Sequence, residues 1–467
     1  ARAETQARKA SESQQQSRRL LYAADMNLAQ QSLKLNNLGR ARRLLDRHRP
    51  QPGEEDLRGW EWRYLWQLTR SSALVTLTNR PTTRGFSVSF SPDGTRLAVG
   101  WYDGHVDLWD VPGRRWVRAL TDREYPHQGR VAFSPVRNLL AATSGPNVVT
   151  QYDLDSGRES ILWRAPDPAA WRVKDLSFSQ DGSRVVISAG STREFGDQVW
   201  VVNVSSAKIE SRHPTSYTGI TAEFLGAARL SPDNRRLYLA RSDALNYRYS
   251  IQCSIQCIDL ITGQELWQTE RQRDYGLTTL AVSPDGRVLA SGSAFEDPII
   301  RVWDAATGRL LVRLDGHTGW VCKLAFTRDG RRLISAATDQ SIRFWDTSNW
   351  TETQVLRGHT DEVHALAISE PARFVASAGK DGNLMLWRDD GKSATDGYRR
   401  LPENLRVNEI LPLDQSRVLL LPPGQPPELV DLKSESPPRS LPEIGSSTNV
   451  LGWFGTNILC HWNGTNQ

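Results

Sequence analysis

Histidine and cysteine, which often carry catalysis or bind metals, are few and scattered in this sequence. The 467 residues include eight His and four Cys, with neither a His-Glu-x-x-His motif nor a Cys-x-x-Cys pair. Zinc sites need such closely spaced ligands, so we expect no metal site. Cys253 and Cys257 lie on one face of an expected strand, about 13 Å apart at ~3.3 Å per residue, which is too far for a disulfide. We expect the thiols to be buried and unpaired.

Signals for nucleotide chemistry are also weak. The tripeptide Gly391-Lys392-Ser393 is similar to the end of a phosphate-binding loop, but such a loop needs a Gly where Leu386 stands. The glycine-rich loop, His-Arg-Asp motif and Asp-Phe-Gly motif of protein kinases are all absent from the sequence. We therefore expect no catalytic residues and no cofactor in this chain.

The polar residues that do recur follow a fixed period. The turn Ser91-Pro92-Asp93-Gly94 returns six more times in varied form at intervals of 42 to 52 residues, and an apolar stretch ending in Trp-Asp or a related pair follows each turn. This period with a Trp-Asp signature is typical of propeller blades. Alternating apolar residues between the turns predict short antiparallel strands. Such small sheets must stack around an axis to bury both of their faces.

These repeats resemble the WD-repeat family of β-propellers, over about residues 73–389. The resemblance implies a mainly β fold in which a His, a Ser or Thr, a turn Asp and a strand Trp form a buried hydrogen-bonded tetrad. The best-matching units imply two such tetrads: His317, Ser335, Asp339 and Trp345, and His359, Ser377, Asp381 and Trp387. We expect these residues to be structural rather than catalytic. The first unit has Val99 in place of the Ser, so we expect that blade to be less firmly held.

The repeat count favours a seven-bladed ring over residues 73–389. A strand at 73–77 would complete the closing blade, which would protect an exposed sheet edge. The third and fourth units carry extra residues at 191–198 and 243–251, between their second and third strands. Residues 390–467 are similar to a degraded eighth repeat and a truncated ninth. We favour the start of a second propeller there over a larger eight-bladed ring.

The N-terminal 70 residues differ from the repeats in pattern and charge. They hold 14 basic and 8 acidic side chains, so they carry the whole excess behind the net charge of +5. Residues 1–19 are predicted to be a polar helix or linker. Residues 20–70 are predicted to be a helical hairpin followed by a third helix, from apolar spacing that starts at Leu21 and ends at Leu68.

A second resemblance concerns this helical segment. Its sequences Leu20-Leu21-Tyr22, Gly39-Arg40-Ala41 and Asp56-Leu57-Arg58-Gly59-Trp60-Glu61-Trp62 look like the linker of bacterial receptor-like serine/threonine protein kinases with C-terminal WD repeats. The resemblance implies an upstream kinase domain in the same polypeptide and a parent that is membrane-anchored in a bacterium. Because the chain begins with Ala and a polar stretch, we expect it to be a fragment of a longer protein.

The position that starts the innermost strand of each unit often faces partners in the WD-repeat family. Aligning the units on their turns gives a candidate partner-binding set, with two adjacent aromatic residues included: Arg84, His127, Trp171, Arg172, Phe224, Tyr275, Trp320 and Glu362. Arginine and aromatic residues dominate binding hot spots.

We therefore expect a non-catalytic protein-interaction or sensor platform, the regulatory WD-repeat region of a serine/threonine protein kinase, with a protein or peptide on the top of the propeller. One alternative is a propeller enzyme with its active site in the central channel. That enzyme would need clustered inward-facing His, Asp or Glu, which the sequence does not show. The other alternative is lipid or nucleic-acid binding by the Arg-rich stretch 40–49, where membrane proximity is favoured over nucleic acid.

Overall fold

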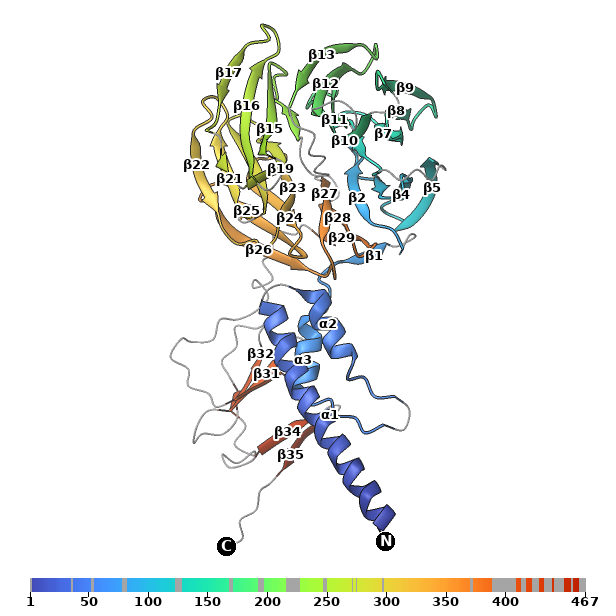
Figure 1. The fold of residues 1–467 in the computed structure, drawn as a ribbon, viewed down its shortest axis with the longest axis vertical. Coiled ribbons are helices and arrows are strands. Elements are labelled where there is room, and N and C mark those ends of the chain that lie inside the picture. The colour runs from blue at the N-terminus through green and yellow to red at the C-terminus, as the bar shows by residue number, and fades with distance from the viewer. Residues whose placement is uncertain are drawn as a thin grey trace. The chain divides into compact units, whose positions relative to one another are not determined.

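Most of the chain folds into small antiparallel sheets arranged around one axis (Figure 1). The computed structural model describes residues 2–34, 37–51, 54–77, 82–121, 128–167, 171–191, 197–215, 227–246, 250–270, 272–273, 275–295, 298–369 and 373–388, and six strands between 409 and 461. The chain divides into two units. One comprises residues 29–43 and 69–390, and the other comprises residues 1–28, 44–68 and 391–467.

Six blades each consist of strands that follow one another along the chain. Blade 1 consists of β2 (Gly85–Phe90), β3 (Arg96–Trp101), β4 (Val106–Asp110) and β5 (Arg115–Thr121). Blade 2 consists of β6 (Val131–Phe133), β7 (Leu139–Gly145), β8 (Val148–Asp153) and β9 (Glu159–Arg164). Blade 3 consists of β10 (Trp171–Phe178), β11 (Arg184–Ser191), β12 (Asp197–Asn203) and β13 (Ile209–Pro214).

Blade 4 consists of β14 (Ala228–Leu230), β15 (Arg236–Asn246), β16 (Ser250–Asp259) and β17 (Glu265–Gln268), and β18 (Gln272–Arg273) also pairs with β16. Blade 5 consists of β19 (Tyr275–Val282), β20 (Val288–Phe295), β21 (Ile300–Asp304) and β22 (Leu310–Leu314). Blade 6 consists of β23 (Val321–Phe326), β24 (Arg332–Ala337), β25 (Ser341–Asp346) and β26 (Thr351–Arg357). The extra residues of the fourth unit extend the β15–β16 hairpin. Those of the third unit fall mostly outside the described residues.

Blade 7 joins the two ends of the ring. Its strands are β27 (Val363–Ser369), β28 (Phe374–Gly379), β29 (Leu384–Arg388) and β1 (Val75–Leu77), which comes from the other end of the propeller sequence. In register, Val75 pairs with Leu386 and Leu77 pairs with Leu384. The Leu77 side chain is buried in one cluster with residues of blades 7 and 1. The prediction of seven blades closed by an N-terminal strand is thus confirmed.

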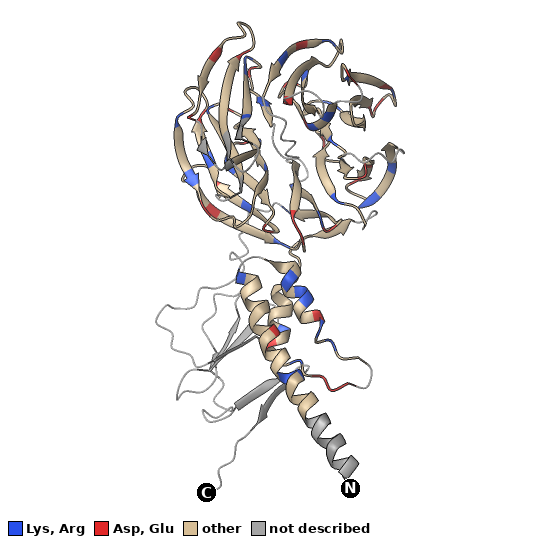
Figure 2. Cartoon of the chain, viewed as in Figure 1, with Lys and Arg blue, Asp and Glu red and all other residues tan. Residues whose placement is uncertain are grey.

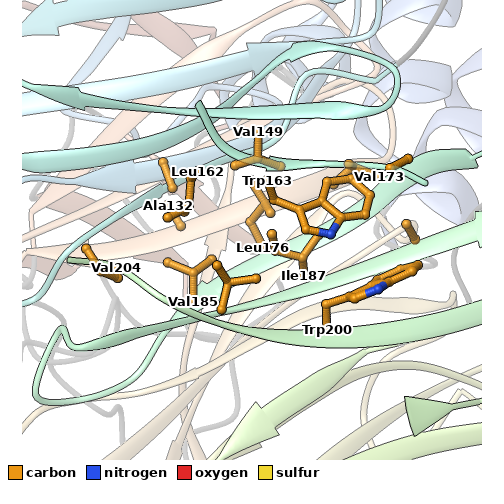
Figure 3. Packing of buried hydrophobic residues seen from close by; sticks show 14 of the residues in the cluster. Ala132, Val149, Leu162, Trp163, Val173, Leu176, Val185, Ile187, Trp200 and Val204 are labelled. Atoms are coloured by element: carbon orange, nitrogen blue, oxygen red, sulfur yellow. The ribbon is translucent and has the colours of Figure 1, made fainter. Parts of the chain in front are cut away.

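The hydrophobic core is divided among the spaces between neighbouring blades. Figure 3 shows one such cluster between blades 2 and 3, where Trp163 and Trp200 pack among Val149, Val185 and Ile187. The two indole rings lie 5.0 Å apart between centroids. Each face of a blade is therefore buried by the blade beside it, which is how these short sheets exclude water.

The N-terminal segment is helical, as predicted. It forms α1 (Arg2–Lys34), α2 (Leu38–Asp46) and α3 (Trp60–Leu68). The indole N–H of Trp62 donates to the carbonyl oxygen of Leu45 at 2.8 Å, and His48 Nε2 lies 2.8 Å from the buried carboxylate of Asp25. These bonds tie α3 and the end of α2 to each other and to α1. None of the described helices combines the length and the hydrophobicity that crossing a membrane requires.

The last part of the chain contributes two further sheets. The first has the strand order of a blade: β30 (Glu409–Pro412), β31 (Arg417–Leu421), β32 (Glu428–Asp431) and β33 (Arg439–Ser440). The second pairs β34 (Asn449–Phe454) with β35 (Asn457–His461). The degraded eighth repeat stays a prediction, and so does the second propeller.

Ring closure gives the first testable prediction. Truncation of Leu77 to Ala removes buried contacts from the closing strand, so the free energy of unfolding should fall by about 2 to 4 kcal/mol. Leu311 lies on the outermost strand of blade 5 and is 42% exposed, so Leu311→Ala should change it by only about 0.5 kcal/mol. Urea unfolding followed by tryptophan fluorescence measures both. Equal losses for the two variants would contradict closure by β1.

Candidate functional site

The polar residues of blade 6 form one continuous hydrogen-bonded chain. His317 Nδ1 lies 2.8 Å from Asp339 Oδ2, and His317 Nε2 lies 2.7 Å from Ser335 Oγ. The indole N–H of Trp345 donates to the same Ser335 Oγ at 2.9 Å. Because Ser335 Oγ accepts from Trp345, it donates its own proton to His317, which then donates from Nδ1 to Asp339. All four polar groups find partners in a buried setting.

The carboxylate of Asp339 is the charged end of this chain. Burial alone would raise its pKa, but hydrogen bonds from His317, Ser341 and the backbone N–H of Thr318 outweigh this and lower the pKa to about 2. The ionised carboxylate is therefore part of the folded structure. A carboxylate with so low a pKa is a poor general base at neutral pH, and the geometry fits a scaffold role.

Blade 7 repeats the arrangement. His359 Nδ1 lies 3.0 Å from Asp381 Oδ2, His359 Nε2 lies 2.7 Å from Ser377 Oγ, and the Trp387 indole N–H donates to Ser377 Oγ at 2.7 Å. Burial would raise the pKa of Asp381, but the bond from His359 leads the contributions that lower it. In both tetrads the His bonds to a Ser 18 positions and an Asp 22 positions later, and the Trp bonds to a Ser 10 positions earlier.

Blade 1 has a different set of buried hydrogen bonds. With Val99 in place of the Ser, the buried indole N–H of Trp109 has no hydrogen-bond partner among the described residues. Asp107 instead accepts from two tryptophans, Trp101 at 2.8 Å and Trp116 at 3.1 Å. The sequence predicted the missing bond but not this replacement, because Trp101 and Trp116 lie outside the repeat signature.

The predicted partner-binding residues lie where the innermost strands begin. We call this face of the propeller the top face, and it carries Arg84, Arg172, Trp320 and Glu362. Arg84 and Arg172 are exposed, whereas Trp320 and Glu362 are partly buried. The Arg84 guanidinium lies over the ring of Tyr102, 5.6 Å from its centroid.

Trp171 is a correction to that predicted set. It is only 3% exposed and packs edge-on against Trp200, with ring centroids 5.1 Å apart. Successive residues of a strand point to opposite sides, so Arg172 faces out while Trp171 turns into the space between blades. Of the other candidates, His127 and Phe224 fall outside the described residues, and the structure gives only the backbone of Tyr275.

The first turn of α2 lies against the top face at blades 6 and 7. The backbone N–H of Gly39 donates to Gln340 Oε1 at 3.0 Å, and Gln340 Nε2 donates to Asn37 Oδ1 at 3.2 Å. A Cβ atom at Gly39 would come 1.9 Å from the carbonyl oxygen of Thr360, so only glycine fits there. A ligand on this part of the top face would share it with α2.

The central channel holds charged residues that the sequence analysis missed. A cavity of about 540 Å³ is lined by the innermost strands, and Asp175, Arg229 and Lys323 face it. Asp175 Oδ2 lies 2.7 Å from Arg229 Nη1, and Asp175 Oδ1 lies 3.1 Å from Lys323 Nζ. Burial opposes the charge on Asp175, but Arg229 and Lys323 hold its pKa well below the usual range.

A simple sequence signal would have found two of these residues. Asp175 and Lys323 each lie four residues before the first residue of their turn, and Arg130 occupies the same position in blade 2. The partner-binding alignment used the position three residues earlier, at the mouth of the ring. Among the described residues, no three His, Cys, Asp or Glu side chains lie close enough together to hold a metal ion.

The Asp339 carboxylate gives a prediction about acid stability. Its folded-state pKa of about 2 is below the ordinary 3.8, so it stabilises the fold above about pH 4, and this contribution disappears as the pH falls towards 2. Asp339→Asn should therefore cost about 2 kcal/mol at pH 7 and flatten the loss of stability between pH 4 and 2. The exposed Asp315→Asn is the control. Denaturant titrations across this pH range test it, and an unchanged acid slope would contradict it.

Comparison with known proteins agrees with this geometry. The family described as "WD domain, G-beta repeat" matches residues 83–110, 266–304, 308–346 and 350–388, which include strands of blades 1, 5, 6 and 7. Periodic tryptophan protein 2 of Arabidopsis thaliana is 28% identical over 262 residues, covering 55% of this chain and 25% of that protein.

Two other relatives align over a longer share of their own length. The WD repeat-containing protein slp1 of Schizosaccharomyces pombe is 23% identical, over 59% of this chain and 52% of slp1. Cell division cycle 20.6, cofactor of APC complex, of Arabidopsis thaliana is 26% identical, over 59% of this chain and 60% of that protein. In each case the match spans less than two thirds of the relative. The structure thus shows a seven-bladed β-propeller, and parts of its sequence match WD40 repeats.

Proposed function

We propose that this chain is a non-catalytic platform that binds a protein or peptide partner on the top face of its propeller. The observation that carries the proposal is the presentation of Arg84, Arg172 and Trp320 at equivalent ends of three innermost strands. A rigid ring fixes these side chains, so binding loses little conformational entropy in the platform. Arginine and tryptophan are also the residues that contribute most at interfaces.

The charges of the top face suggest how a partner would be selected. Figure 2 shows basic and acidic residues interspersed over the blades. On the top face, Glu362 lies 3.0 Å from Lys380 and 3.2 Å from His364. The side chains of Glu362 and Lys380 are about one-third exposed, at 34% and 31%. Such partly exposed pairs favour specificity over affinity, because a wrong partner would leave one member unpaired.

We further propose that the platform is the regulatory region of a serine/threonine protein kinase whose kinase domain precedes it. This rests on the resemblance of residues 20–62 to kinase-linked helical segments. The relatives described above are eukaryotic WD proteins, and one is named as a cofactor of the APC complex, so they support protein binding without indicating a kinase. Coding sequence upstream of Ala1 tests this finer proposal: a kinase domain there would support it, and its absence would refute it.

Membrane proximity is the third part of the proposal. The start of α2 is rich in arginine, with Arg40, Arg42 and Arg43 in one turn. Each near-surface cation contributes roughly 1 kcal/mol of attraction to anionic headgroups. Flotation with vesicles containing phosphatidylserine should therefore depend on salt. Flotation that is independent of salt and of anionic lipid would remove this part.

The top-face proposal predicts a selective loss of binding. Peptides selected by phage display against the whole chain should bind it, and Trp320→Ala combined with Arg172→Ala should weaken them at least ~10-fold, because two hot-spot residues are lost. Fluorescence anisotropy measures the affinity. Far-UV circular dichroism and the melting temperature should stay unchanged, since both side chains lie at the end of the ring.

A matched double variant controls for general effects. Arg287 directly follows the Ser-Pro-Asp-Gly turn of blade 5, and its side chain is 86% exposed. Ile261 lies in the turn between β16 and β17 and is 73% exposed. Arg287→Ala with Ile261→Ala should leave peptide affinity within about twofold. Peptides that bind the Trp320/Arg172 double variant as tightly as they bind the wild-type chain would contradict the assignment of the binding site to the top face.

A further inference from the structure

We propose that the central channel contains an anion-binding site in which Arg229 and Lys323 bind a phosphate group. This site is separate from the top face and does not depend on the proposed function. It comes from the innermost strands of different blades, so it exists only in the closed ring.

Positive charge exceeds negative charge at this site. Arg229 and Lys323 supply two positive charges beside the single carboxylate of Asp175, which lies 2.7 Å from Arg229 Nη1 and 3.1 Å from Lys323 Nζ. These three groups therefore carry a net charge of about +1 when all of them are ionised. Partly buried cations are expected to be paired, and one carboxylate cannot neutralise two. An anion in the channel would supply the missing charge.

Both cationic side chains have more hydrogen-bond donors than the described residues use. Lys323 Nζ has three N–H donors, and its one hydrogen bond to a described residue goes to Asp175. Arg229 makes both of its hydrogen bonds to described residues through Nη1, to Asp175 Oδ2 and to the Ala228 carbonyl oxygen, each at 2.7 Å. Within the described part of the chain, donors on both side chains are thus left for a ligand.

These donors are accessible from the cavity. The side chains of Arg229 and Lys323 are 20% and 21% exposed, so water and small ions can reach them in the cavity. Burial lowers the pKa of Lys323, and the positive charges of Arg229 and Arg130 lower it further. The Asp175 carboxylate acts in the opposite direction and raises this pKa. A bound anion would relieve this repulsion, which makes anion binding and protonation of Lys323 mutually favourable.

The donors of this site fit a phosphate group. A guanidinium presents a planar fork of donors that matches two phosphate oxygens, and an ammonium adds a point charge. The cavity of about 540 Å³ is within the size range of small-molecule sites, roughly 300 to 1,000 Å³. It can therefore hold a phosphate ester or a diphosphate, and we take pyrophosphate as the probe.

Isothermal titration of the whole chain with pyrophosphate at low ionic strength tests the site. Lys323→Gln should weaken binding at least ~10-fold, because a charge-assisted hydrogen bond is lost. Asp175→Asn should tighten binding several-fold, because it removes a negative charge that repels the anion. Both variants break the same Lys323–Asp175 ion pair, so a merely structural role would change binding in the same direction in both.

The control variant is Lys208→Gln, which removes an exposed lysine from the turn between β12 and β13 and should leave affinity unchanged. Circular dichroism checks folding. If Lys323→Gln fails to fold, Arg229→Lys, which keeps the charge but loses the fork, should weaken binding instead. Three results would overturn the proposal: no binding of pyrophosphate to the wild-type chain, equal effects of Lys208→Gln and Lys323→Gln, or changes of the same sign in Lys323→Gln and Asp175→Asn.

Discussion

A four-stranded sheet with two apolar faces cannot bury both of them alone, and the propeller depends on this constraint. Each blade needs a neighbour on both sides, so the array is stable only as a closed ring. The clusters between blades, such as that around Trp163 and Trp200, meet this need. The closing strand β1 does the same for blade 7, where the chain would otherwise leave an edge open.

Most polar residues of the repeat serve this packing. The tetrads of blades 6 and 7 satisfy buried His, Ser and Asp groups while they fix the strand order within a blade. The functions proposed above rest instead on residues that the ring displays. These lie on the top face, where Arg172 and Trp320 mark the strand ends, and in the channel, where Asp175, Arg229 and Lys323 meet.

The sequence predicted the fold well because the repeat encodes local structure and spacing together. The seven blades followed from turn and Trp-Asp signals, whereas the closing strand and both tetrads were implied by the resemblance to WD-repeat proteins. Other features depend on contacts between distant residues. Strand alternation places only one of the neighbours Trp171 and Arg172 inward, and packing against Trp200, 29 residues later, decides that it is Trp171. The Asp175–Lys323 pair joins residues 148 positions apart, which one sequence cannot reveal without placing the blades around the ring.

The central claim is that a rigid closed ring binds its partner through the top face. Hydrogen–deuterium exchange of the chain with and without a selected peptide tests it most directly. The account predicts slower exchange at the starts of β2, β10 and β23, with no change at the Ser-Pro-Asp-Gly turns of the opposite face. Protection confined to those turns, or to the outermost strands of the blades, would contradict it.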